Sequence, residues 1–146
     1  MKKIKGFTLI ELIVVMAIIG VLTGILVPSL VGYINDARLS RANANAKSVF
    51  STAAQYATLC ERDNAYVIDP INAYQLKKDE EFNYDGSHMG QYIGSVLAAN
   101  DNGGCASVKM EGSVPKETAW ADDETSIFVG KYPNPAKESG ESLTLS

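Results

Sequence analysis

The sequence predicts an α+β fold in which the second half of a long N-terminal helix packs on a small antiparallel β-sheet. Apolar residues recur with gaps of three and four far beyond the apolar stretch near the N-terminus, as they do on one face of a helix. Segments that alternate polar and apolar residues, as strands do, occur only late in the chain. Helices first and strands later favour an α+β arrangement.

The first half of the expected helix is apolar on every side. Between Phe7 and Val31 the one charged side chain is Glu11. As a helix this stretch would measure about 37 Å, at about 1.5 Å per residue, which is enough to cross a bilayer. Lys2, Lys3 and Lys5 precede it and should remain in the cytoplasm, so we expect the rest of the chain outside.

The second half of the helix is expected to be amphipathic and to end near Arg62. Its apolar stripe would pack on the body of the protein, whereas the first half has no partner in its own chain and needs lipid or further copies of itself. The stripe consists of Leu39, Ala42, Ala46, Val49 or Phe50, Ala53, Ala57 and Cys60.

Beyond Arg62 the pattern predicts two short helices followed by strands. Asp69-Pro70 has the form of an N-cap with proline at the first helical position. Asp85-Gly86 is a turn signal. The expected helices are residues 71–78 and 87–99, the expected strands are 105–111 and 126–132, and an edge strand is expected around Leu143 and Leu145.

The charge distribution argues against nucleic acid as a ligand of the body. The formal net charge is −4, and without the three N-terminal lysines it becomes −7 (−4 minus 3). Binding to phosphates needs concentrated positive charge.

The two cysteines, Cys60 and Cys105, form no Cys-x-x-Cys pair and no Cys/His cluster, so zinc is not expected. In an exported domain they would form one disulfide, and the alternative is two free buried thiols.

Catalytic motifs are absent from the sequence. His88 is the one histidine, and no Gly-x-Ser-x-Gly, phosphate loop or Gly-x-Gly-x-x-Gly occurs. The acidic residues 122–124, together with Asp101 or Asn102, could bind calcium, but the EF-hand spacing is missing. We therefore expect no metal, no cofactor and no enzymatic activity.

Glu11 is the anomaly of the apolar stretch, because a carboxylate in such a place usually has a partner. No basic residue follows one turn later, and Lys5 would lie on another face. The interpretation is that the partner comes from elsewhere, or that Glu11 is protonated. A candidate is the amino group that cleavage before Phe7 would create on a neighbouring copy, since the two charges would neutralise each other in a low-dielectric setting.

The lysine-rich leader, Gly6, Phe7 and the sequence up to Glu11, followed by an unbroken apolar helix, resemble the class III signal of type IV prepilins and pseudopilins. This resemblance covers residues 1 to about 35. It implies that a membrane-embedded aspartic prepilin peptidase cuts after Gly6 and that Phe7 is then N-methylated. It also implies that Glu11 is the family's assembly glutamate.

The resemblance divides the chain into a leader (1–6), a transmembrane and assembly half of the helix (7–34), an amphipathic half (35–62) and a globular α+β head (63–146) of the pilin fold. Gly20 and Pro28 fall where many family members break the helix. Proline removes a helical hydrogen bond, so the helix should kink or loosen near Thr23 and Gly24. Either this is a gentle membrane-helix kink, or the segment melts when the helix enters a filament.

The function that the resemblance implies is a structural subunit of a type IV pilus, serving adhesion, motility or DNA uptake. Its partners would be further copies in a helical homo-polymer, the prepilin peptidase, the inner-membrane assembly platform, minor pilins and, before assembly, membrane lipid. The chain would be a single-pass membrane protein first and part of an extracellular filament afterwards. A pseudopilin of a type II secretion or competence system is the alternative. An anchored enzyme or ligand-binding module is a third hypothesis, which the missing catalytic residues oppose.

Overall fold

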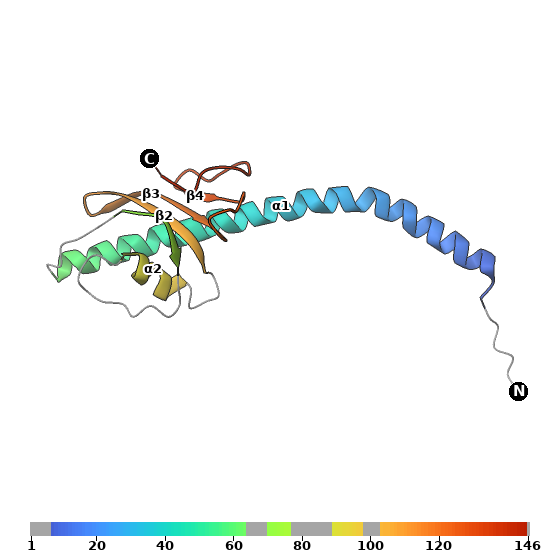
Figure 1. Ribbon diagram of the computed structural model, residues 1–146, viewed down its shortest axis with the longest axis horizontal. Coiled ribbons are helices and arrows are strands. Elements are labelled where there is room, and N and C mark those ends of the chain that lie inside the picture. Colours follow the sequence, from blue (N-terminus) through green and yellow to red (C-terminus); the bar gives the residue numbers. More distant parts are fainter. Residues whose placement is uncertain (1–6, 64–69, 77–88, 98–102, 146) are drawn as a thin grey trace, which may run out of the picture. The chain divides into compact units, whose positions relative to one another are not determined.

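The computed structural model describes residues 7–63, 70–76, 89–97 and 103–145. The chain divides into two units, Met1–Asp36 and Ala37–Ser146. The elements along the chain, all but β1 of them labelled in Figure 1, confirm the predicted α+β class. They are α1 (Leu9–Arg62), β1 (Ile71–Leu76), α2 (Met89–Leu97), β2 (Gly104–Glu111), β3 (Val114–Ala121) and β4 (Gly130–Tyr132).

Helix α1 has the extent that the sequence predicted, and it stays helical through Pro28. In the first unit the helix is thus continuous at Gly24, and the kink or loosening expected near Thr23 and Gly24 stays a prediction. An added Cβ at Gly20 or Gly24 would meet no atom within 4 Å. These glycines are not required for packing in the isolated chain, and melting of this segment in a filament stays a prediction.

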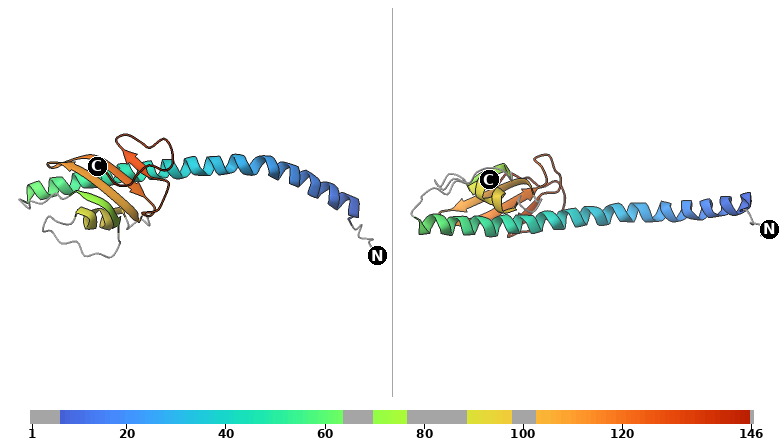
Figure 2. Two further views of the ribbon diagram at one scale, coloured as in Figure 1. Left: turned by 45° about the horizontal axis from the view of Figure 1, so that its top comes forward. Right: turned by 90° about the horizontal axis from the view of Figure 1, so that it is seen from below.

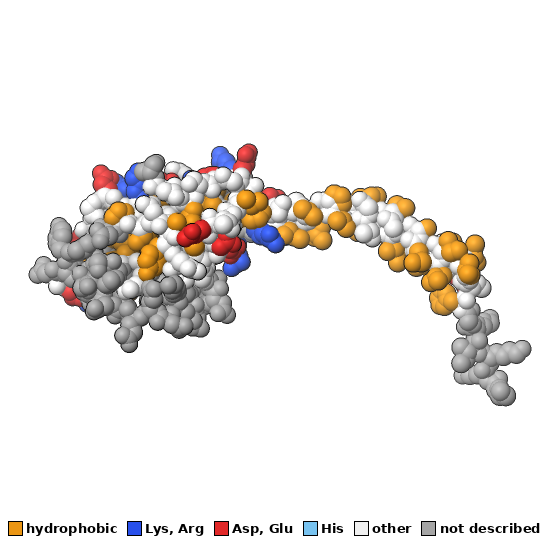
Figure 3. Space-filling view, in the orientation of Figure 1, with side chains coloured by type: hydrophobic (Ala, Val, Ile, Leu, Met, Phe, Trp, Pro, Cys, Tyr) orange, Lys and Arg blue, Asp and Glu red, His pale blue; other side chains and the backbone are white. Residues whose placement is uncertain are grey.

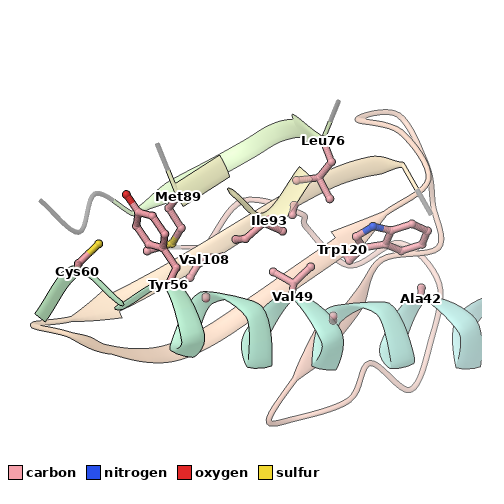
Figure 4. Close-up of a cluster of buried hydrophobic side chains, with 12 residues drawn as sticks. Ala42, Val49, Tyr56, Cys60, Leu76, Met89, Ile93, Val108 and Trp120 are labelled. Atoms are coloured by element: carbon pink, nitrogen blue, oxygen red, sulfur yellow. The ribbon is translucent and has the colours of Figure 1, made fainter. Parts of the chain in front are cut away.

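In the second unit a four-stranded antiparallel sheet, in the order β1-β2-β3-β4, lies across the second half of α1 (Figure 2). Side chains alternate between the two faces of the sheet. Val108 and Trp120 extend from β2 and β3 toward Val49 and Ala42 of α1 (Figure 4). The predicted stripe on α1 is confirmed, since the residues that α1 buries are Ala42, Ala46, Val49, Thr52, Ala53, Tyr56, Ala57 and Cys60.

Helix α1 and strand β4 approach each other so closely that a side chain would not fit between them. A Cβ on Gly130 would overlap the carbonyl group of Ala42 and the backbone nitrogen of Asn43. The Asn43 side chain then joins α1 to the chain around β4. Its Oδ1 accepts from the backbone N–H groups of Lys131 and Ala136, both at 3.0 Å, and its Nδ2 donates to the Ala136 carbonyl at 2.9 Å. The sheet and α1 are thus fixed by hydrogen bonds as well as by apolar contact.

Three predictions about secondary structure are wrong in the described residues, and the first two concern residues 71–76 and 126–132. Residues 71–76 form a strand instead of a helix, because pairing with β2 buries Leu76 and half-buries Tyr74. Of residues 126–132, only Gly130–Tyr132 is a strand, since a turn held by Asp123 and Ser126 precedes it. The helix 87–99 and the strand 105–111 are confirmed where they are described.

Strand β3, Val114–Ala121, was not predicted, because Pro115, Lys116 and Glu117 break its apolar alternation. The expected edge strand at Leu143 is also wrong, since this side chain packs without strand pairing in the second core cluster. His88 and the Asp85-Gly86 turn lie outside the described residues.

The predicted disulfide is absent from the structure, in which Cys60 and Cys105 are both buried and free. Cys60 belongs to the core cluster between α1 and the sheet, and Cys105 belongs to the cluster on the opposite face. The register pairs Cys105 with Ala121, whose side chain shares that opposite face. The sheet therefore separates the two thiols, and the alternative of two buried thiols holds.

We expect both thiols to react only after unfolding. Burial, together with the negative charges of Glu124 and Asp123, raises the pKa of the Cys105 thiol and keeps it protonated and unreactive. Titration of the native protein with a thiol reagent should label neither cysteine, and titration in denaturant without reductant should label both. A chain that yields thiols only after reduction would contradict the structure.

Candidate functional site

The start of α1 carries a pair of side chains that bond to each other, Thr8 and Glu11. The backbone N–H of Thr8 donates to Glu11 Oε2 at 2.8 Å, and the Thr8 hydroxyl donates to the same oxygen at 2.6 Å. The backbone N–H of Glu11 donates in turn to Thr8 Oγ1 at 3.4 Å. The Thr8 carbonyl accepts the first helical bond, from Leu12, so Thr8 is the N-cap. This reciprocal arrangement is a capping box.

The capping box corrects the interpretation that Glu11 must find its partner outside its own chain. Thr8 supplies two donors, which is compatible with a charged carboxylate at the end of an apolar helix. Both donors bond to Oε2, and no described residue donates to Oε1. One oxygen of the carboxylate therefore remains able to accept a hydrogen bond from another molecule.

The surroundings of Glu11 are apolar and open. Phe7 is 86% exposed. Together with Ile10, Val14 and Val15 it lines a shallow hollow of about 310 Å³ beside Glu11. Figure 3 shows the apolar side chains continuing along the N-terminal half of α1. By length and composition this helix is able to cross a membrane, and within the described residues it is the one helix that meets this criterion.

The remaining predicted site residues are placed as follows. Gly6 lies outside the described residues, so the proposed cut and the N-methylation of Phe7 stay predictions. Gly20, Gly24 and Pro28 lie within the exposed half of α1. They lie further along the same helix as the capping box and are not part of it.

The acidic residues 122–124 are engaged in local contacts. Asp123 accepts hydrogen bonds from the backbone N–H and the hydroxyl of Thr125, at 2.8 and 2.6 Å, and these bonds lower its pKa. Asp122 forms an ion pair with Arg41 at 3.5 Å. The part of the chain that the structure describes contains no group of three potential metal ligands.

Fold and site together define an α+β protein with an exposed apolar helix that begins in a glutamate-containing cap. Residues 1–27 match the family described as prokaryotic N-terminal methylation motif. The chain is also 37% identical over 92 residues to two fimbrial proteins of Pseudomonas aeruginosa, and each match covers 62% of this chain and 59% of the relative. The motif and these relatives support the type IV pilin family.

The match thus spans less than two thirds of the length of the fimbrial relatives. No solved structure matches the chain with comparable significance.

Proposed function

We propose that this chain is the structural subunit of a type IV pilus filament. The observation that carries the proposal is Glu11, a carboxylate with one open oxygen at the start of a helix whose N-terminal half exposes its apolar side chains on every side. A helix of this kind needs lipid or copies of itself as its surroundings. The filament is preferred to a secretion pseudopilin because the relatives are named fimbrial proteins.

In this proposal, a prepilin peptidase removes residues 1–6 after Gly6, and Phe7 becomes the N-methylated first residue. The new amine of one copy then donates to Glu11 Oε1 of a neighbour, while Thr8 of the neighbour holds Oε2. The opposite charges attract strongly because the helices exclude water. Each added copy is thereby placed in the same register.

The proposed division of labour follows the chain. Residues 7–34 anchor the subunit in the membrane and later form the filament core, with Gly20, Gly24 and Pro28 allowing the helix to loosen there. Residues 35–62 carry the head, 63–146, which is exposed on the filament. The inner-membrane assembly platform and minor pilins would be the further partners, and the lysines of the leader place the N-terminus in the cytoplasm.

Intact mass spectrometry of the purified filament protein tests the processing. We expect a chain that begins at Phe7 and carries one additional methyl group. The precursor from cells that lack the peptidase should have the full mass and serves as the control. Filaments built of chains that retain residues 1–6 would contradict the proposal.

A further inference from the structure

One surface of the second unit combines a cation that forms no ion pair with the described residues and an exposed apolar side chain. The guanidinium of Arg38 lies over the ring of Phe128, 5.7 Å from its centre. Ile127, the next residue, is 58% exposed, although most large apolar side chains of this unit are covered. We refer to Arg38, Ile127 and Phe128 as the Arg38 face.

The charges around the Arg38 face leave its guanidinium available. Arg41 is paired with Asp122 at 3.5 Å, and Asp123 is bonded to Thr125. Asp36 lies two positions before Arg38 on α1, and side chains at that spacing do not face each other. No carboxylate of the described residues forms an ion pair with Arg38. The stacking on Phe128 holds its planar group in place.

Distance along α1 places Arg38 close to a bilayer surface if the chain is anchored as proposed above. With Glu11 at the inner surface, the stretch from Leu12 to Val31 measures about 30 Å, which is the thickness of the hydrocarbon core. Arg38 follows Val31 by about 10 Å along the helix. The headgroup layer is about 5–7 Å thick on each side. Helical side chains tilt toward the N-terminus of their helix, so an arginine at this position has the length to extend toward that layer.

We propose that the Arg38 face rests on phospholipid headgroups while the subunit waits in the membrane. The guanidinium donates hydrogen bonds to a lipid phosphate, for which its fork of N–H groups is suited. Ile127 enters the interface beside it. This contact rests on the proposed membrane anchoring, and it would hold the body in one orientation before a neighbouring copy receives it.

Lipid is the occupant that the observations favour over a second copy. The apolar half of α1 leads directly into the unit that carries the Arg38 face, so the bilayer surface lies within reach of every anchored subunit. Charge complementarity points the same way, because each phospholipid offers a phosphate to the unpaired guanidinium. A second copy could occupy the Arg38 face only where the density of subunits in the membrane is high.

Spin labels on the full-length chain in lipid nanodiscs test the proposal. A label on Ile127→Cys is compared with a label on Val114→Cys, since Val114 is 56% exposed and lies at the turn between β2 and β3. The native cysteines are buried and stay unlabelled. We expect the label at 127 to be several-fold less accessible to a water-soluble nickel complex than the label at 114. Arg38→Gln should remove this difference, and Lys47→Gln should preserve it.

Three outcomes would overturn the proposal. Equal accessibility at 127 and 114 would exclude contact with the headgroups, provided that a label at Val21→Cys is deep in the hydrocarbon. Protection at 127 that disappears when the nanodiscs hold a single copy would assign the face to a second copy. If the label at position 21 is accessible to the nickel complex, the helix is not in the bilayer, and both the membrane anchoring and this inference are wrong. If the label at 21 is protected and only the label at 127 is accessible, this inference is wrong and the proposed function is unaffected.

Discussion

Replacing Glu11 by alanine is expected to reduce the yield of filaments at least tenfold, while cleavage after Gly6 continues. The change removes both carboxylate oxygens, and with them the proposed acceptor for the amine of a neighbouring Phe7. An unpaired amine among apolar helices is unfavourable, so added copies would lose both attraction and register. Electron microscopy of sheared cells measures the filaments, and immunoblotting of the chain measures processing.

A second substitution separates assembly from helix capping. Thr8→Val removes the hydroxyl that donates to Glu11 at 2.6 Å and retains the backbone N–H that donates at 2.8 Å. The carboxylate and its Oε1 stay in place. We expect filament yield to fall less than twofold in this variant. An equal loss in Thr8→Val and Glu11→Ala would attribute the effect to the capping box and contradict pairing between copies.

The extent of α1 and its buried face could be predicted because the apolar residues that indicate them recur along the chain. The apolar stretch fixes the first half, and the stripe from Leu39 to Cys60 recurs at helical spacing over several turns. Each repeat adds evidence for the same element. The structure accordingly has α1 from Leu9 to Arg62, and the buried side chains are nearly the predicted ones.

The sheet was predicted less well, because its strands depend on partners that are distant in the sequence. Residues 71–76 have a local helix-start signal, yet pairing with β2 decides their conformation. Proline is disfavoured inside a sheet, but Pro115 lies at the start of β3, next to a register shift in the pairing with β2. Strand β4 pairs with Thr118, Ala119 and Trp120 only, so the missing N–H of Pro115 costs no bond on that side.

The functional site shows the same contrast between local and distant signals. The Thr-x-x-Glu spacing at Thr8 and Glu11 is a local capping signal that could have been recognised before an apolar run. The contact of Asn43 with Ala136 had no such signal, since it joins residues that are 93 positions apart in the sequence. Likewise, two distant cysteines in the sequence did not reveal that a sheet lies between them.

Among the glycine-to-alanine changes in the described part of the second unit, Gly130→Ala should cause the largest loss of stability, because its added Cβ would make the closest contacts. The added Cβ would overlap the Ala42 carbonyl, so α1 and β4 would have to separate. Overpacking of this kind costs about 1–3 kcal/mol. The separation would also strain the bonds of Asn43 and the buried bond from the Thr118 hydroxyl to the Ala46 carbonyl at 2.8 Å. Each would add about 1 kcal/mol.

The expected total is about 3 kcal/mol or more, which lowers the melting temperature by about 10 °C or more in a unit of this size. Thermal unfolding of the full chain in detergent, followed by circular dichroism, measures it. Gly103→Ala is the matched control, because its Cβ would meet only the Leu76 carbonyl oxygen, at 3.9 Å. Its melting temperature should stay within a few degrees of the parent. If Gly130→Ala melts like Gly103→Ala, then α1 does not approach β4 as closely as the structure shows, and the hydrogen bonds of Asn43 to Lys131 and Ala136 could not form with this geometry.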